Sequence, residues 1–413
     1  MICVINKMNY FCNLNIAKME TLLETHREYL NHYESLFDRF VDIDWNDRLI
    51  GLTGARGVGK TTYLFNQIKN GLGPNSKPLY VSLDDIYFTE HKLVELADQW
   101  VKMGGTHLFL DEVHKYNNWS QELKNINDRF KKLYVVFTGS SLLDVLKGQA
   151  DLSRRSVVHT LNGLSFREFL EVETKQKFPI HTLEEILENH EKLTTEILKK
   201  VKPFAFFKDY LQYGYYPFYL ESIKSYHRKL MSTLTLMIEV DLPYQRNVEV
   251  RYIHKLKKLI THIAHTVPFQ PNITKLAGDI ETSRQTVIHY LKFLEESKII
   301  NLLHSKESSD SHLAKPDKIF LHHPNIMYAL NPKSVNEGTL RESFFFNQVA
   351  NVHKVISSPD SDFLVDDTYT FEIGGKSKKK KQIKNLENAF VVSDNIEHGY
   401  GNIIPLWLFG FMY

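Results

Sequence analysis

Cysteine, glycine and proline are scarce in this sequence, and neither sign of charge prevails. The only cysteines are Cys3 and Cys12, too few for the disulfide framework of a small secreted protein, so we expect a protein of the reducing cytoplasm. Nineteen glycines and 13 prolines among 413 residues exclude a collagen-like chain and argue against disorder. The formal net charge of +2 excludes a whole-protein field that would steer the chain onto nucleic acid or a membrane.

Long apolar runs are also missing. No stretch approaches the roughly 18 consecutive apolar residues of a membrane-spanning helix, and the first residues lack the basic start of a signal peptide. We therefore expect a soluble, cytoplasmic protein with no membrane partner.

The length of 413 residues predicts two to three domains, at roughly 150 residues each. Shifts in pattern along the chain divide it into five segments. These are a helical extension (1–45), an α/β core (46–162), a helical lid or linker region (163–249), a winged-helix-like domain (250–335) and a small α/β C-terminal domain (336–413).

Strand and helix patterns alternate in the α/β core. Short apolar runs at 48–53, 78–83, 107–111 and 133–138 read as buried strands, and amphipathic segments between them read as helices. This alternation predicts a parallel sheet with helices on both faces. A helical apolar period from Ala17 to about Asp42 predicts one more helix before the first strand.

A phosphate-binding loop follows the first predicted strand. Residues 54–61 match G-x-x-x-x-G-K-[ST] and open a helix, which is the context that the motif requires. Backbone N–H groups of such a loop surround phosphate oxygens, the lysine reaches the β- and γ-phosphates, and the hydroxyl ligates Mg²⁺. The predicted ATP-binding residues are Gly54, Ala55, Arg56, Gly57, Val58, Gly59, Lys60, Thr61 and Thr62.

Two carboxylates end the third predicted strand. Asp111 would join Thr61 in holding Mg²⁺, and Glu112 would act as general base toward the attacking water. Acidic residues at a strand end are common, so this pair supports a nucleotide site only in combination with the intact phosphate loop.

Two further residues are catalytic candidates. Ser140 follows the fourth strand, where a hydroxyl could contact the γ-phosphate, although a simple polar turn is nearly as good an interpretation. Arg155 lies in an arginine pair, and arginine neutralises charge on a transferred phosphoryl group. A structural arginine pair is an equally good interpretation.

Several motifs together resemble a known family. The phosphate loop, Asp111-Glu-Val-His-Lys-Tyr116 with Trp119, the Thr-Gly-Ser-Ser141 run, the arginine pair and Leu164-Ser-Phe-Arg-Glu-Phe169 look like the bacterial and archaeal AAA-type ATPases near the origin-recognition and signal-transducing NTPases. Tyr213-Gly-Tyr-Tyr-Pro217 resembles the family's glycine-glycine-aromatic-proline turn. The resemblance implies a P-loop NTPase fold, ATP and Mg²⁺ as cofactors, and Arg155 as an arginine finger that would act on a neighbour in a homo-oligomer.

A helix-turn-helix pattern with a wing occupies residues 272–303. Its second helix would present outward Ser283, Arg284, Gln285, His289 and Lys292. Duplex DNA is one predicted partner, but winged helices also serve as protein-binding modules.

The tail has some features of a metal-dependent nuclease. Asp362, Glu372 and Lys376 resemble a D…E-x-K arrangement in a restriction-endonuclease-like fold. However, Lys376 lies four positions after Glu372, roughly 13 Å along a strand instead of roughly 7 Å, unless a bulge shortens the step. Six lysines between 376 and 384 could contact phosphates or form a solvated face.

The sequence thus predicts an ATP-binding protein, a Mg²⁺-dependent ATPase that acts as a nucleotide-driven switch. The alternative is a DNA-associated ATPase whose ATP state gates a DNA-binding or inactive nuclease-like domain. A nucleotide-binding scaffold that hardly hydrolyses ATP is a third interpretation, against which the Asp111-Glu112 pair argues.

Overall fold

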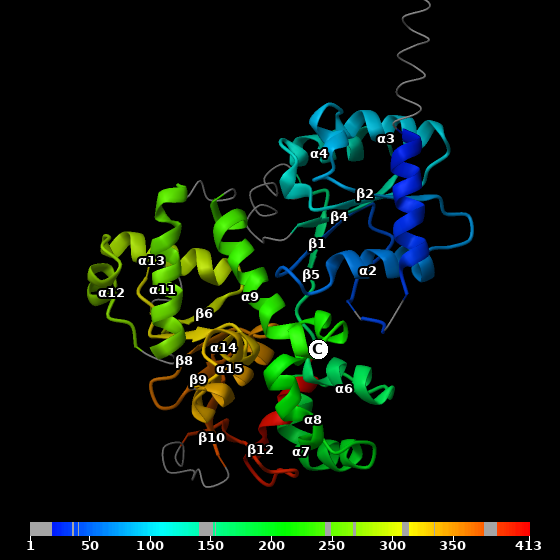
Figure 1. Cartoon of the computed structure of the whole chain (residues 1–413). Helices are drawn as coiled ribbons and strands as arrows, with labels where there is room; N and C mark the ends of the chain where they lie inside the picture. The colour runs from blue at the N-terminus through cyan, green and yellow to red at the C-terminus, as the bar shows by residue number, and fades with distance from the viewer. Residues whose placement is uncertain are drawn as a thin grey trace, which may run out of the picture. The chain divides into compact units, whose positions relative to one another are not determined.

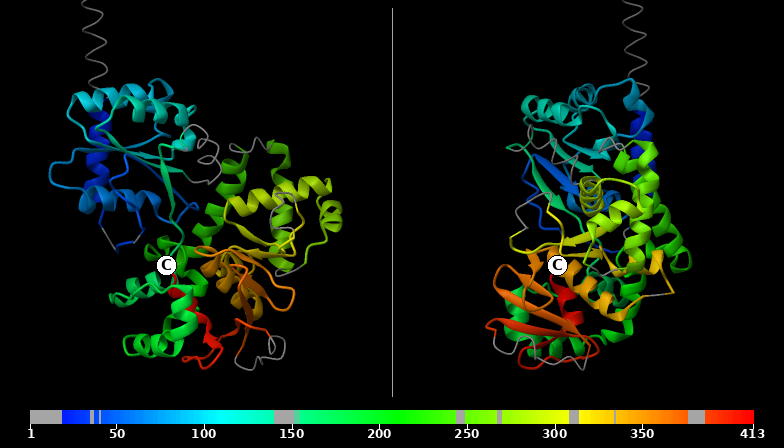
Figure 2. Two further views of the ribbon diagram at one scale, coloured as in Figure 1. Left: turned by 180° about the vertical axis from the view of Figure 1, so that it is seen from behind. Right: turned by 90° about the vertical axis from the view of Figure 1, so that its left-hand side faces the viewer.

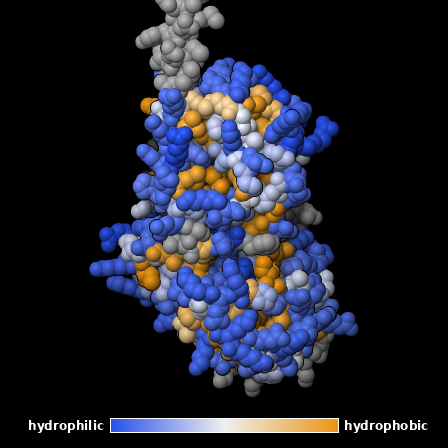
Figure 3. Space-filling view, turned by 90° about the vertical axis from the view of Figure 1, so that its right-hand side faces the viewer, coloured by the Kyte–Doolittle hydropathy of each residue, from blue (hydrophilic) through white to orange (hydrophobic). Residues whose placement is uncertain are grey.

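The computed structural model describes residues 19–34, 37–39, 41–139, 152, 154–243, 249–266, 270–307, 314–333, 335–375 and 386–413. The chain divides into two compact units, Met1–Leu161 and Asn162–Tyr413. Among the described residues, no helix is both long and apolar enough to span a bilayer. The face shown in Figure 3 is mostly hydrophilic, and apolar residues on it occur in separate patches.

A five-stranded parallel sheet forms the centre of the first unit (Figure 1). Its order is β2-β3-β4-β1-β5. The strands are β1 (Leu49–Thr53), β2 (Pro78–Ser82), β3 (His107–Asp111), β4 (Tyr134–Gly139) and β5 (Val157–Thr160). Because the inner strands are buried on both faces, they are almost continuously apolar, as parallel sheets require.

Helices cover both faces of this sheet. They are α2 (Lys60–Asn66), which continues in a π-helical turn (Gln67–Gly71), α3 (Leu93–Lys102) and α4 (Trp119–Arg129), with 3₁₀ turns at Ile86–Thr89 and Val113–Lys115. Helices α3 and α4 pack with alternate strand residues such as Leu79, Leu108 and Val135 in one apolar core. The predicted α/β architecture, a P-loop NTPase sheet with helices on both faces, is confirmed.

The N-terminal helix ends earlier than its apolar period predicts. The helix covers residues 19–32 rather than continuing to about Asp42. Beyond it, the Tyr33 carbonyl accepts a hydrogen bond from Lys69, and Arg39 Nη1 donates to the Val58 carbonyl at 2.9 Å. The chain beyond the helix thus contacts residues before and after the start of α2.

Strand β5 was not anticipated at all. It pairs with β1 in parallel, with Gly51 opposite Val158 and Thr53 opposite Thr160. The strand is only four residues long, and its two ends are exposed, so it lacks the apolar run of the inner strands.

The second unit begins with a helical segment. Its helices are α6 (Phe166–Thr174), α7 (Leu183–Leu198), α8 (Phe204–Asp209), which continues in a π-helical turn (Tyr210–Gly214), and α9 (Tyr226–Leu236), followed by another such turn (Met237–Asp241). Both α6 and α7 start with a capping box, at Ser165 with Glu168 and at Thr182 with Glu185.

Three helices and a two-stranded antiparallel sheet come next. They are α11 (Ile253–Thr266), α12 (Ile273–Asp279), α13 (Arg284–Glu296), β6 (Ile300–Leu303) and β7 (Lys318–Leu321). Asn272 and Ser283 cap α12 and α13, each through a side-chain oxygen that accepts a backbone N–H.

A second sheet closes the unit. After α14 (Pro324–Leu330) and α15 (Glu337–Ala350), the chain forms β8 (Val355–Ser357), β9 (Phe363–Val365), β10 (Tyr369–Gly374), β11 (Ala389–Ser393) and β12 (Ile403–Pro405). Strands β8, β9 and β10 are antiparallel neighbours, whereas β10, β11 and β12 are parallel. The mixed order is β12-β11-β10-β9-β8.

The last 3₁₀ segment, Leu406–Phe411, lies in the core of the second unit. All six residues are buried, and the segment contacts α6, α7 and α15 (Figure 2). Residues that the sequence analysis divided among three domains therefore share one compact unit.

Asn325, at the start of α14, holds the π-helical turn after α8. Its Nδ2 donates to the carbonyls of Tyr210 and Leu211 at 2.9 and 2.8 Å, and its Oδ1 accepts the Tyr215 N–H at 2.9 Å. One buried amide thus satisfies backbone groups that the end of a helix leaves unpaired. The Tyr213–Pro217 motif is thereby fixed in the core.

His26 joins the N-terminal helix to the edge of the first sheet. Its Nδ1 accepts the N–H of Tyr80, on the side of β2 that has no neighbouring strand, at 3.1 Å. An accepting ring nitrogen carries no proton, and burial, together with nearby Arg27, lowers the pKa of His26 to about 4.

This pKa predicts a loss of stability in acid. In the unfolded chain His26 takes up a proton near pH 6.5, whereas in the folded protein it does not. Its contribution to the unfolding free energy is therefore complete above pH 6.5 and decreases as the pH falls to about 4. Wild-type protein should lose roughly 2–3 kcal/mol of unfolding free energy from this group over that range. His26→Gln keeps an acceptor but cannot titrate. Its unfolding free energy, measured by urea unfolding between those pH values, should therefore depend less on pH than that of the wild type. Equal pH dependence in both proteins would contradict the assignment.

Candidate functional site

The loop between β1 and α2 has positive φ angles at its three glycines. Gly54, Gly57 and Gly59 have φ angles of 153°, 85° and 93°, which other residues rarely adopt. A Cβ at Gly54 would lie 2.2 Å from the carbonyl oxygen of Leu161, so that position has no room for a side chain. Between the last two glycines, Val58 is fully buried and anchors the loop.

Lys60 lies over this loop. Its Nζ donates to the carbonyls of Gly54 and Ala55 at 2.9 and 3.1 Å, and the residue is only 6% exposed. The remaining members of the predicted set lie along the loop and the first turn of α2, where Arg56 is half-buried and Thr62 exposed. The ammonium group is therefore held close to the carbonyls at the start of the loop.

Asp111 is the hydrogen-bonding centre of the site. Its buried carboxylate accepts from Thr61 Oγ1 at 2.6 Å and from the Tyr80 hydroxyl at 3.0 Å, both on Oδ2. Its Oδ1 accepts from the Thr138 hydroxyl and from the Glu112 N–H. The structure thus brings together Thr61 and Asp111, the two residues predicted to hold Mg²⁺.

Tyr80 was missed by the sequence analysis. It lies inside a strand, where its ring reads as core, and only the structure shows its hydroxyl on Asp111. Burial, and then the neighbouring charge of Asp111, raise the pKa of Tyr80 far above its usual value. The phenol therefore stays protonated and acts as a donor to the carboxylate.

Glu112 follows Asp111 in a left-handed conformation, with φ 53° and ψ 40°. Its N–H is directed at Asp111 Oδ1 and at Thr138 Oγ1, 3.1 Å away. Its carboxylate Oε2 lies 3.3 Å from Nε2 of His114, whose side chain is completely buried. The candidate base is thus fixed at both its backbone and its carboxylate.

The other two catalytic candidates are not part of this cluster as described. Ser140 lies outside the described residues. Arg155 forms a two-pronged ion pair with Asp128, because its Nε and Nη2 lie 3.0 Å from the two carboxylate oxygens. This contact lowers the pKa of Asp128 and ties Arg155 to the end of α4.

In the second unit, two of the predicted nuclease residues lie close together. Asp362 Oδ2 accepts the N–H of Ile373, next to Glu372, whose buried carboxylate accepts from Ser361 Oγ at 2.6 Å. Lys318 lies 3.5 Å from Asp362 and 3.7 Å from Glu342.

Within the described ranges, no group of three or more histidine, cysteine, aspartate or glutamate side chains could hold a metal ion. Lys376 and the lysine-rich stretch up to residue 384 lie outside those ranges.

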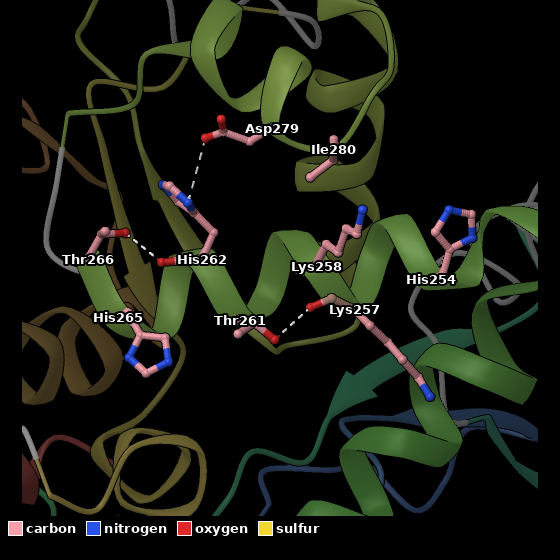
Figure 4. Close-up of a pocket in the computed structure, with 9 residues that line it drawn as sticks. All are labelled: His254, Lys257, Lys258, Thr261, His262, His265, Thr266, Asp279 and Ile280. Atoms are coloured by element: carbon pink, nitrogen blue, oxygen red, sulfur yellow. Dashed lines mark hydrogen bonds and ion pairs between the residues drawn. The ribbon is translucent and has the colours of Figure 1, made fainter.

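A groove of about 570 Å³ runs along α11 and the end of α12 (Figure 4). Lys258 points toward Ile280 there, and His262 points toward Asp279, 3.9 Å away. Because Lys258 also lies 3.6 Å from Glu281, carboxylates offset much of the positive charge in this groove. On α13, Arg284 and Gln285 are exposed, whereas Lys292 is half-buried beside Glu295.

Family models match two parts of the chain. Residues 46–170 match a family described as an AAA domain, and residues 205–337 match a domain of unknown function, DUF8612. The first match spans the phosphate loop, Thr61 and Asp111, so the N-terminal part of the chain resembles an AAA-type P-loop ATPase domain.

Individual relatives are distant. The uncharacterized protein MJ1544 of Methanocaldococcus jannaschii is 23% identical over 265 residues, which cover 61% of this chain and about half (55%) of that relative. The Walker-type ATPase PABY2304 of Pyrococcus abyssi has a TM-score of 0.40 at 12% identity, over 76% of this chain and 94% of that one. For AMPPCP-bound DnaA from Aquifex aeolicus, the TM-score is 0.24 at 16% identity, over 67% and 87%. Because these TM-scores are low, the functional inference rests on the residues of the site.

Proposed function

We propose that the protein is a Mg²⁺-dependent ATP hydrolase that works as a nucleotide-driven switch. The observation that carries the proposal is the contact of 2.6 Å between Thr61, the hydroxyl of the phosphate loop, and Asp111, the carboxylate that ends β3. A hydroxyl at the start of α2 and a carboxylate at the end of β3, beside a glycine-rich loop, suit a nucleotide with its metal ion.

Each residue has a chemical task in this proposal. The loop N–H groups and the N-terminus of α2 bind phosphate oxygens, and Lys60 exchanges its loop carbonyls for the β- and γ-phosphates. Thr61 and Asp111 fit Mg²⁺, which prefers hard oxygen ligands and, when bound, neutralises charge on the phosphates. Glu112 accepts the proton of the attacking water.

The switch role rests on where the first unit ends. Leu161 is its last residue, and the N–H of Leu161 donates to the Thr53 carbonyl at 2.8 Å, directly before the phosphate loop. The carbonyl of Leu161 occupies the space that a Cβ of Gly54 would need. A loop that rearranges around a nucleotide therefore acts on the residue through which the chain enters the second unit.

Two substitutions test the hydrolase. Lys60→Ala should weaken ATP binding by at least about tenfold, because an ammonium group on the phosphates is lost. Glu112→Gln should keep ATP affinity and lose turnover, because it removes the base and leaves Thr61 and Asp111 in place. Binding is measured with a fluorescent nucleotide, and turnover as phosphate release.

Lys102→Ala, an exposed lysine of α3 paired with Asp98, is the matched control for loss of a positive charge. It should leave both measurements unchanged. Wild-type affinity in Lys60→Ala would reject the nucleotide site, and wild-type turnover in Glu112→Gln would reject Glu112 as the base.

Arg155 could serve a neighbouring subunit in a homo-oligomer. An arginine supplied in trans stabilises charge in the transition state by orders of magnitude in rate. Specific activity should then rise with protein concentration, and mixing Arg155→Ala with Lys60→Ala should partly restore turnover.

The ion pair with Asp128 supplies the control for this role. If Arg155 acts only through Asp128, Asp128→Ala should lose as much activity as Arg155→Ala; if it is a finger, Asp128→Ala should remain active. Concentration-independent activity would leave Arg155 as a structural residue.

The alternative proposal is a DNA-associated ATPase. The order α11-α12-α13-β6-β7 and the exposed Arg284 at the start of α13 favour a winged-helix module that contacts duplex DNA. If so, duplex DNA should raise ATP turnover, and the effect should weaken steeply with salt, because phosphate contacts release counterions. ATP turnover that duplex DNA leaves unchanged at low salt would instead favour a nucleotide-driven switch without a DNA-binding role.

A further inference from the structure

A buried histidine contacts the candidate base. His114 is the second residue of the 3₁₀ turn after β3, and its side chain has no exposed surface. Its Nε2 lies 3.3 Å from Oε2 of Glu112. A carboxylate can only accept, so Nε2 is the atom of this pair that is able to donate.

The turn that carries His114 is itself held firmly. The N–H of Lys115 donates to the Glu112 carbonyl at 2.9 Å. The hydroxyl of Tyr116 donates to Glu122 Oε1 at 2.9 Å and accepts the N–H of Leu93 at 3.3 Å, which ties the turn to α4 and α3. The imidazole therefore lies in a turn that is tied to both α3 and α4.

Glu112 needs such a donor because its backbone does not decide where its carboxylate points. The left-handed φ and the two acceptors of its N–H fix the Cα, but three side-chain torsions remain. A buried imidazole 3.3 Å from one carboxylate oxygen restricts those torsions. A base held in one orientation needs less reorganisation when the water is deprotonated.

We propose that His114 is a positioning residue that holds the Glu112 carboxylate in its working orientation. The inference rests on the proposed hydrolase function and deepens it, since His114 acts through Glu112 and contacts neither ATP nor the metal ion. Its loss should therefore lower kcat while leaving ATP affinity and KM nearly unchanged.

Two substitutions distinguish the effect of the N–H donor of His114 from the effect of its side-chain volume. His114→Leu fills the buried space without a donor, and its kcat should fall by about tenfold or more, since misplacing a reacting group by about 1 Å costs up to about a hundredfold. His114→Gln offers an amide N–H near the position of Nε2 and should recover most of the lost kcat. Nucleotide affinity and the melting temperature are measured alongside to confirm folding.

The matched control is His91→Leu. His91 is a half-buried histidine of the same unit, its ring tilted against that of Tyr87 with the ring centres 4.4 Å apart, and among the described residues neither of its ring nitrogens has a hydrogen-bond partner. Its substitution should leave kcat unchanged. A fall equal to that of His114→Leu would show that any buried histidine matters and would overturn the proposal.

A double-mutant cycle distinguishes positioning from general stability. In a Glu112→Gln background, His114→Leu should cause no further loss of residual turnover, because the group it positions is absent. Additive losses, or wild-type kcat in His114→Leu while Glu112→Gln is inactive, would overturn the role of His114 alone. Full turnover in Glu112→Gln would instead reject the proposed base, so the two failures are distinguishable.

Discussion

The nucleotide site depends on one buried carboxylate, that of Asp111. A buried charge is costly unless donors surround it, and here the donors come from the start of α2, from β2, from β4 and from the backbone beyond β3. The strand order makes this possible, because β3 lies between β2 and β4. The register that pairs Leu110 with Phe137 sets Thr138 beside Asp111. A slip of one residue in either neighbouring strand would turn a hydroxyl to the opposite face, so the carboxylate also selects the correct pairing of the sheet.

Much of this site could be predicted from sequence because its chemistry is local in the chain. The phosphate loop is a continuous motif, and Asp111 ends an apolar run that reads plainly as a strand. Tyr80 and His114 could not be predicted in the same way. Each resembles an ordinary core residue, and its role arises only when strand pairing or a tight turn brings its polar end to a carboxylate. No spacing rule along the chain encodes such contacts.

The fold shows the same division. Strand β3 was predicted to the residue and the inner strands β1 and β4 to within one residue at each end, since burial on both faces demands a continuous apolar run. Strand β5 was missed because an edge strand with exposed ends needs no such run. The N-terminal helix was extended too far, since its apolar period continues into residues that tertiary contacts with Lys69 and Val58 draw out of the helix. In the tail, the sequence pattern grouped Asp362 with Glu372, and Asp362 accepts the N–H of the residue next to Glu372. The pattern could not show that Lys318, from a different sheet, lies beside Asp362.

The buried position of Leu406–Phe411 has a consequence for how the protein is made. The first unit has its whole sheet once Leu161 has been synthesised, so it can fold while the ribosome is still translating the rest. The second unit lacks part of its core until this 3₁₀ segment has left the exit tunnel, because α6, α7 and α15 pack against it. Until that segment is made, these helices present uncovered apolar faces, α6 and α7 for far longer than α15. Chaperone binding during translation should therefore concentrate on the second unit and cease when its last segment arrives.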